Sequence, residues 1–172
     1  QPFGEAVKNT LNWIYNKAKE DGFEVENHDG YCVEITYGKQ EETVMVLGHA
    51  DVVPVGEGWS YPPFGGEIHD NLIYGRGASD DKGPTLAAYY GLKIIKDLQI
   101  PLKRQIKIVV GGNEESGSLC MHHYFHTLGK KAPTYGFTPD ADFPLIYGEK
   151  GIMTYVYEGD FTDNVIESFD AG

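Results

Sequence analysis

Cysteine is scarce in this sequence of 172 residues, which contains only Cys32 and Cys120. Neither belongs to a Cys-x-x-Cys motif or to a cluster with histidine, so a zinc site built from thiolates is excluded. We expect both to be buried, reduced thiols. Long apolar runs are also missing, because no stretch approaches the ~20 residues that span a bilayer, and the first residues do not form a basic then apolar leader. These features predict a cytoplasmic protein without a membrane partner.

Basic residues are few as well, with 14 Lys and Arg against 26 Asp and Glu and a net charge of -12. A chain of this charge repels phosphate backbones and anionic lipid, so we expect no nucleic-acid partner. The acidity itself is compatible with a solvated negative surface or with carboxylates that converge on cations. The hydrophobic content of 41% is sufficient for one core, which predicts a single compact domain.

The apolar residues recur with helical or strand periodicity along most of the chain. We expect helices over residues 5–20, from Pro84 to about Leu98, and over roughly 118–128. The second helix rests on a repeat of every fourth residue, at Leu86, Tyr90, Ile94 and Leu98. We expect strands in a hairpin over 23–37, at 43–47 and 105–111, and near 67–68, 72–74, 145–147 and 152–157. This alternation predicts an α/β three-layer sandwich with a mixed, twisted sheet.

Side chains that can bind metals gather at four places where predicted strands or strand-to-helix connections end. These places are His49-Ala50-Asp51, Asp80-Asp81, Glu114-Glu115 and Asp140-Ala141-Asp142. Sites in open α/β sheets form beyond the strand ends. Imidazole and carboxylate groups suit zinc, manganese and cobalt when no thiolate is present. His49 and Asp51 lie two residues apart on an extended segment, so the carboxylate can fix the imidazole tautomer that binds a metal.

The alternative for each place is a solvated acidic turn or a structural histidine. Adjacent carboxylates repel one another unless a cation is present. Flanking glycines indicate a tightly specified backbone, and apolar strands lead directly into each place. The sequence therefore favours a metal site over acidic surface turns.

Several motifs resemble those of the co-catalytic metallopeptidases that include aminoacylase, glutamate carboxypeptidase and carnosinase. They are His49-Ala50-Asp51, Gly75-Arg76-Gly77 through Asp80-Asp81-Lys82-Gly83, and Glu114-Glu115. Two further segments, GWSYPPF at 58–64 and FTPDADFP at 137–144, are closest to the bacterial peptidase V type dipeptidases. The resemblance extends over nearly the whole chain, and it implies the catalytic domain of a zinc-exopeptidase-like enzyme.

The resemblance also implies a centre of two divalent cations, Zn²⁺ with Mn²⁺ or Co²⁺ as alternatives. It makes Asp80 the ligand that bridges both cations, His49 and Asp140 ligands of the first, and Glu115 a ligand of the second. Asp142 stays open as an alternative to Asp140.

Two neighbouring carboxylates receive catalytic roles from the same resemblance. Asp51 would orient His49, and Glu114 would be the general base that accepts a proton from a water held between the cations. A cis peptide bond is implied between Asp80 and Asp81. We expect Arg76 and Lys82 to pair with neighbouring carboxylates.

The implied activity is hydrolysis of a dipeptide amide bond, with small peptides as substrates. N-acyl amino acid hydrolysis and a non-catalytic metal-binding fragment remain the alternatives. Enzymes of this kind take a last histidine ligand and a lid domain from later sequence, so we expect residues 1–172 to be the N-terminal part of a catalytic domain, inactive alone, with a lid starting near 160–172. His122, His123 and His126 have the spacing of a metal tract, but an exposed helix face is favoured for them.

Overall fold

The computed structural model describes residues 2–142 and 144–151. The chain divides into two units, Gln1–Ala141 and Asp142–Gly172, and the sheet and helices described below belong to the first. Residues 145–147 of the second unit form no strand, so the strand expected there was wrong. The strand expected near 152–157 and the lid start expected near 160–172 lie outside the described residues.

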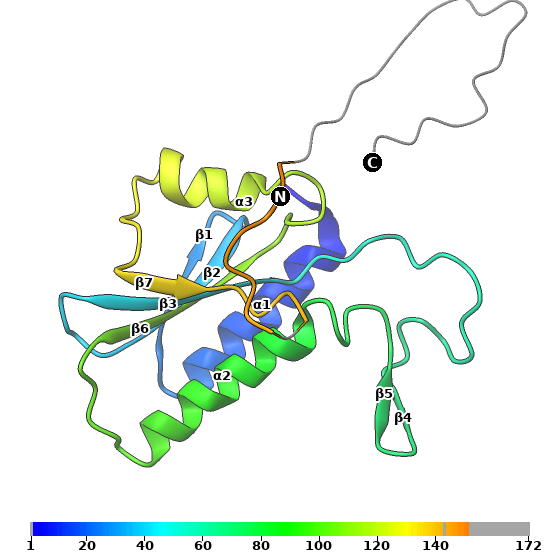
Figure 1. Cartoon of the computed structure of the whole chain (residues 1–172), viewed down its shortest axis with the longest axis horizontal. Coiled ribbons are helices and arrows are strands. Elements are labelled where there is room, and N and C mark those ends of the chain that lie inside the picture. Colours follow the sequence, from blue (N-terminus) through cyan, green and yellow to red (C-terminus); the bar gives the residue numbers. More distant parts are fainter. Residues whose placement is uncertain (1, 143, 152–172) are drawn as a thin grey trace, which may run out of the picture. The chain divides into compact units, whose positions relative to one another are not determined.

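A mixed five-stranded sheet forms the centre of the first unit, in the order β1-β2-β6-β3-β7 (Figure 1). Its strands are β1 (Glu24–His28), β2 (Cys32–Tyr37), β3 (Thr43–His49), β6 (Gln105–Gly111) and β7 (Tyr135–Phe137). β1 and β2 form an antiparallel hairpin, and β2 is antiparallel to β6. β3 runs parallel to both β6 and β7, so these three strands have their carboxyl ends at one edge of the sheet.

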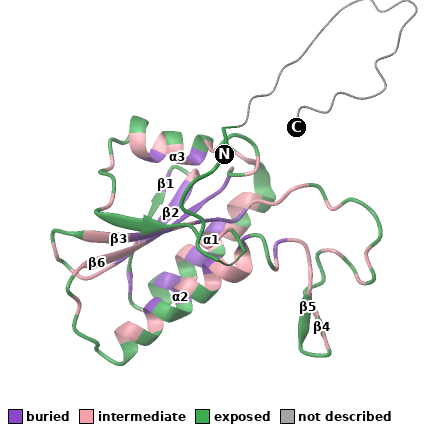
Figure 2. Ribbon diagram, in the orientation of Figure 1, coloured by how far each residue is buried: buried purple, intermediate pink, exposed green. Residues whose placement is uncertain are grey.

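Helices cover both faces of this sheet, which confirms the predicted α/β class (Figure 1). Leu11, Ile14 and Ala18 of α1 (Gly4–Glu20) share one core cluster with Tyr89 and Leu92 of α2 (Lys82–Asp97). The opposite face packs against α3 (Leu119–His122) and the π-helical turn η1 (His123–Thr127), through Cys32, Met45, Val109 and Tyr124. Burial is accordingly concentrated in the central strands and on the inward faces of the helices (Figure 2).

The hairpin, the two central strands and the first helix confirm the sequence predictions. The hairpin turns at Asp29 and Gly30, both with positive φ, as the Asp-Gly pair predicted. Residues 52–66 form no helix or strand, as expected of the Pro- and Gly-rich segment, and a separate ribbon of β4 (Glu67–His69) and β5 (Leu72–Tyr74) follows. Cys32 and Cys120 are buried free thiols. No helix in the described part of the chain has the length and apolarity to cross a membrane.

The second helix forms, but three of the four residues whose spacing predicted it are exposed. Tyr90, Ile94 and Leu98 are 47%, 56% and 69% exposed. A repeat of four drifts by about 40° per step around a helix of 3.6 residues per turn, so it cannot remain on one face. The buried residues are Thr85, Tyr89 and Leu92. Tyr89 is compatible with burial because its hydroxyl donates to Asp21 Oδ2 at 2.5 Å.

A buried charge network lies between the sheet and η1, centred on the Glu34 side chain of β2, which is only 4% exposed. Glu34 is paired with Lys107, and its Oε2 accepts from Tyr124 Oη at 2.8 Å and Lys130 Nζ at 3.1 Å. Burial alone would raise the pKa of Glu34, but Lys107 and Tyr124 outweigh it and lower the pKa to about 2.

Replacing Glu34 should therefore reduce the stability of the fold and change how that stability depends on pH. The folded pKa lies below the ordinary value of 4.5, so the charged form stabilises the fold above about pH 4.5 and that stabilisation is lost as pH falls toward 2. We expect Glu34→Gln to lose roughly 3 kcal/mol near neutral pH and to flatten the stability curve in this window. Urea unfolding at several pH values measures both effects.

Glu26→Gln is the matched control, because Glu26 also pairs with Lys130 but its side chain is 54% exposed. It should cost less than about 1 kcal/mol. An equal loss of unfolding free energy in the two variants would contradict the role of the buried network. So would a Glu34→Gln variant whose stability depends on pH as the wild type's does.

Candidate metal centre

The four predicted acidic places are arranged around one edge of the sheet. β3 ends at His49, with Asp51 two residues beyond. β6 ends at Gly111 and leads to Glu114 and Glu115, and β7 ends at Phe137 and leads to Asp140. Asp80 arrives from the other direction, immediately before the N-cap residue of α2. Because β3, β6 and β7 are parallel, their carboxyl ends bring these side chains together.

His49 is the centre of this arrangement and is only 2% exposed. Its Nδ1 lies 3.2 Å from the carbonyl oxygen of Asp51 and 3.4 Å from Asp51 Oδ1. Its Nε2 lies 3.1 Å from Asp80 Oδ1 and 3.2 Å from Asp140 Oδ2. A proton on Nδ1 is donated to Asp51, which leaves the Nε2 lone pair facing two carboxylates. That geometry favours a proton or a metal cation between Nε2 and the two carboxylates.

The electrostatics of the edge agree with an excess of negative charge. Burial alone would lower the pKa of His49, but Asp51 and Asp140 outweigh it and raise the pKa to about 9. Burial raises the pKa of Asp140, and Asp80 beside it adds to the rise. The site therefore favours any group that adds positive charge.

Asp51 connects the loops that follow β3 and β6. Its Oδ1 accepts the backbone N–H of Glu114 at 3.0 Å, and its Oδ2 accepts that of Glu115 at 3.1 Å. Burial alone would raise the pKa of Asp51, but His49 and the two amides lower it, so the carboxylate stays ionised. The predicted role of Asp51 in orienting His49 is compatible with these contacts, and it stays a prediction.

At this edge of the sheet there are two groups of three side chains, and within each group the ligand atoms lie within 4.8 Å of one another. One group is His49, Asp80 and Glu115, and the other is His49, Glu114 and Asp140. Glu115 Oε1 is buried and has no hydrogen-bond partner among the described residues. A cation would satisfy this oxygen, and the imidazole and carboxylate donors suit zinc, manganese or cobalt. The residues present thus fit the implied metals.

The division of ligands between two cations stays a prediction. His49 belongs to both groups, and Glu114, predicted to be a non-coordinating base, lies in the second one. Asp140 Oδ2 lies 3.2 Å from His49 Nε2, whereas Asp142 is the first residue of the second unit. The arrangement places Asp140 at the site, and the alternative of Asp142 stays open.

Asp81 is a site-forming residue whose role the sequence did not reveal. It is fully buried, and its Oδ2 accepts the backbone N–H of His49 at 3.1 Å and the hydroxyl of Thr85 at 2.8 Å. The cis peptide bond implied between Asp80 and Asp81 is present. The two carboxylates therefore have different roles, since Asp80 faces the site while Asp81 binds the end of β3 to the start of α2. A threonine four residues after Asp81, on the next helical turn, was the available signal.

Arg76 also differs from its prediction, because it forms no ion pair with a carboxylate among the described residues. Its Nη2 instead donates to the carbonyl oxygens of Val55 at 3.2 Å and Pro54 at 3.4 Å. Its guanidinium carbon lies 5.3 Å from the centre of the Trp59 ring.

Other candidate sites do not match the chemistry of the strand ends. Glu26, His28 and Glu34 also form a group of ligand atoms, but Lys107 and Lys130 already neutralise Glu34. His122 and His126 are exposed, as expected of a helix face, whereas His123 stacks on Tyr31 and lies 3.0 Å from Asp29.

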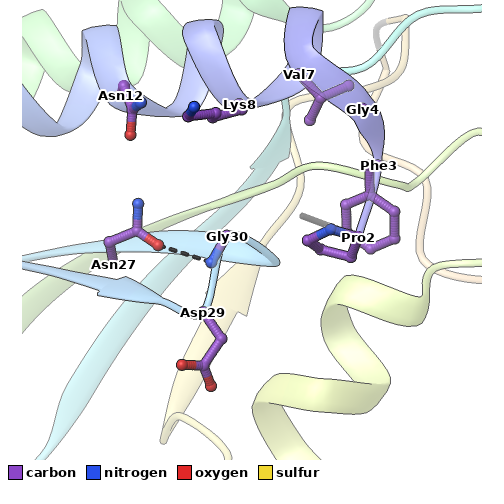
Figure 3. Close-up of a pocket in the computed structure, with 9 residues that line it drawn as sticks. All are labelled: Pro2, Phe3, Gly4, Val7, Lys8, Asn12, Asn27, Asp29 and Gly30. Atoms are coloured by element: carbon purple, nitrogen blue, oxygen red, sulfur yellow. Dashed lines mark hydrogen bonds between the residues drawn. The ribbon is translucent and has the colours of Figure 1, made fainter.

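A pocket of about 320 Å³ lies between the start of α1 and the β1–β2 turn (Figure 3). Lys8 and Asp29 are the charged residues among those that line it, and Asn27 Oδ1 accepts the backbone N–H of Gly30 at 2.8 Å. Asp29 is the partner of His123, and Lys8 pairs with Glu5. The pocket therefore lacks the convergent ligands found beyond β3.

The chain belongs to peptidase family M20/M25/M40, whose model matches residues 45–158. It is 46% identical to "Putative dipeptidase YtjP" of Bacillus subtilis over 153 residues, which is 89% of this chain and 33% of that protein. It is 44% identical to "Putative dipeptidase SH1171" of Staphylococcus haemolyticus, covering 90% of this chain and 32% of that protein. The chain thus spans about a third of the length of these relatives.

Solved structures support the fold. Human carnosine dipeptidase 1 matches 80% of this chain and 33% of its own with a TM-score of 0.70, at 24% identity. The M20 family metallo-carboxypeptidase Sso-CP2 of Sulfolobus solfataricus has the same TM-score and the same coverage, at 27% identity.

Gly48 should tolerate no side chain, because it lies where β3 meets α2. A Cβ there would lie 1.9 Å from Thr85 Oγ1 and 2.7 Å from Asp81 Oδ2. We expect Gly48→Ala to lower the free energy of unfolding by roughly 1–3 kcal/mol and to weaken binding of divalent cations, since the His49 backbone must shift. Thermal unfolding and calorimetry with Zn²⁺ measure the two effects.

Gly91→Ala in α2 is the matched control, because a Cβ there meets nothing within 4 Å. It should raise stability by about 0.5–1 kcal/mol and leave cation binding unchanged. The same change of stability in both variants would show that a side chain at position 48 does not clash with Thr85 and Asp81.

Proposed function

We propose that this chain is the N-terminal part of the catalytic domain of a metal-dependent dipeptidase. The proposed centre holds two divalent cations, Zn²⁺ with Mn²⁺ or Co²⁺ as alternatives, and the substrates are free dipeptides. The observation that carries this proposal is the convergence of His49, Asp80 and Asp140 at one strand edge, with Glu115 beside them. Membership of the peptidase family and the names of the relatives support the reaction class.

The metals and the protein would divide the chemistry between them. When bound, the cations would polarise the scissile carbonyl and make a water acidic enough to lose a proton near neutral pH. Glu114 would accept that proton at its carboxylate and deliver it to the leaving amine. Asp51 would fix both the His49 imidazole and the backbone of Glu114, so the base and the ligand keep a constant separation.

We propose that these 172 residues are inactive without the rest of the polypeptide. The last histidine ligand and the groups that bind the substrate carboxylate would come from the two thirds of the relatives' length that this chain does not span. We also propose a cytoplasmic location, where Cys32 and Cys120 stay reduced as buried thiols.

Two substitutions in the full-length protein separate metal binding from proton transfer. Glu114→Gln keeps the size of the side chain but cannot accept the proton, so we expect kcat for a dipeptide to fall by roughly 10²–10⁴-fold with the metal content retained. Asp80→Asn should lose bound metal and activity together, because it removes the predicted bridging charge. Elemental analysis and dipeptide hydrolysis measure the two properties.

Asp97→Asn is the control, because Asp97 lies at the end of α2 and pairs only with Lys93 among the described residues. It should match the wild type in both assays. Full activity in Glu114→Gln would refute the proposed base, and cleavage of N-acyl amino acids with dipeptides left intact would replace the dipeptidase assignment by a deacylase.

A further inference from the structure

We propose that Arg76 is a positioning residue for the metal centre, acting through a contact with Trp59 that fixes the two loops leading into the site. The proposal rests on the metal centre proposed above. The first loop, residues 52–66, leaves Asp51, and the second, residues 75–80, leads into Asp80. We use the name loop clasp for the contact between Arg76 and Trp59 together with the hydrogen bonds that these two residues make to backbone oxygens of residues 54–63.

The loop clasp is built from a cation–π contact and four hydrogen bonds. The guanidinium of Arg76 lies 5.3 Å from the centre of the Trp59 ring, and its Nη2 donates to the carbonyl oxygens of Pro54 and Val55. Trp59 Nε1 donates to the same Val55 oxygen at 2.7 Å. The backbone N–H of Arg76 donates to Pro63 O at 2.7 Å. Two loops without helix or strand are thereby joined at both the backbone and the side chains.

A second contact between the same loops lies one residue closer to the metal ligands. Gly77 has a φ of +86°, and a Cβ there would lie 3.0 Å from Val52 Cγ1 and 2.7 Å from Lys82 Nζ. Val52 directly follows Asp51, and Lys82 begins α2. The loop clasp thus joins the segment that follows Asp51 to the segment that leads into Asp80, whose Oδ1 lies 3.1 Å from His49 Nε2.

The environment of Arg76 indicates a geometric role. Its Nε is buried without a hydrogen-bond partner among the described residues, an arrangement that disfavours the fold by itself. The planar guanidinium can stack on an aromatic ring and donate to carbonyl oxygens at the same time, which an ammonium cannot reproduce. Asp80 needs such external support because its own side chain is 54% exposed.

The test is the affinity of the full-length protein for Zn²⁺, measured by calorimetry for the wild type, Arg76→Ala and Arg76→Lys. Groups that orient metal ligands typically change metal affinity by about 10–100-fold when removed. We expect Arg76→Ala to weaken binding within that range and Arg76→Lys to recover only part of the loss. If Arg76→Ala does not fold, Arg76→Lys and Trp59→Phe, which removes the bond to Val55, still give the comparison.

Arg104→Ala is the matched control. Arg104 also makes a cation–π contact, with its guanidinium carbon 4.6 Å from the centre of the Tyr135 ring, and it pairs with Glu42. It precedes β6 and so lies at the opposite end of the strands from the metal ligands. Its loss should lower stability without changing Zn²⁺ affinity. A purely structural Arg76 would behave in the same way.

Fluorescence reports whether the loop clasp has opened. The 172 residues contain two tryptophans, Trp59 and the 52% exposed Trp13 of α1. The full-length protein with Trp13→Phe is therefore compared with the same protein also carrying Trp59→Phe, and the difference in emission reports Trp59. In that background, Arg76→Ala should shift Trp59 emission to longer wavelength as the ring loses its cover. A shift together with weakened Zn²⁺ binding supports the proposal.

Wild-type affinity in the Arg76 variants overturns the role of the loop clasp and leaves the metal centre intact. A wild type that binds no cation overturns both, and this failure is visible before any variant is made.

Discussion

The carboxylate of Asp51 is the constraint on which the candidate site depends. It accepts the backbone amides of Glu114 and Glu115 and lies beside Nδ1 of His49, so one side chain joins the ends of β3 and β6. The backbone N–H groups of Glu114 and Glu115 lie beyond the last paired residue of β6, and an ionised acceptor satisfies both of them. This one group therefore contacts the imidazole and the backbone of both glutamates, and its role in orienting His49 stays a prediction.

The site also combines burial with an excess of negative charge around His49. Asp81 is fully buried behind His49 and holds the end of β3 to Thr85, while Gly48 leaves the space in which this contact forms. The fold therefore brings several carboxylates to one buried histidine at a cost in electrostatic repulsion. Binding of cations at this edge would relieve the repulsion, so the features that position the site also favour metal there.

Much of the fold was predictable because its signals are local. Buried strands at β3 and β6, the Asp29-Gly30 turn and the spacing of Leu11, Ile14 and Ala18 each follow from neighbouring residues. β7 was missed because it has three residues, all exposed, and pairs only at three positions of β3. Most of the apolar repeat that predicted α2 is exposed, because burial there depends on Tyr89 and Thr85. The hydroxyl of Tyr89 bonds to Asp21, and that of Thr85 bonds to Asp81 on the preceding turn.

The site shows the same division between local and tertiary information. Residue type and position were enough to mark the four acidic places, and the family resemblance selected Asp80 and Asp140 within them. The structure brings both carboxylates within hydrogen-bond distance of His49. The roles of Asp81 and Arg76 were missed. The Thr85 signal for Asp81 is local, but the His49 amide that Asp81 binds and the carbonyl groups that Arg76 binds come near only in the folded chain. Motifs therefore reported the groups that face the site, and not the groups that hold them there.

The most direct test of this account is anomalous diffraction from crystals of the full-length protein grown with Zn²⁺. The account predicts two anomalous peaks at the carboxyl ends of β3, β6 and β7, both bound by Asp80, one of them also by His49 Nε2. Peaks confined to the Glu26, His28 and Glu34 group, or to surface histidines such as His122 and His126, would contradict it.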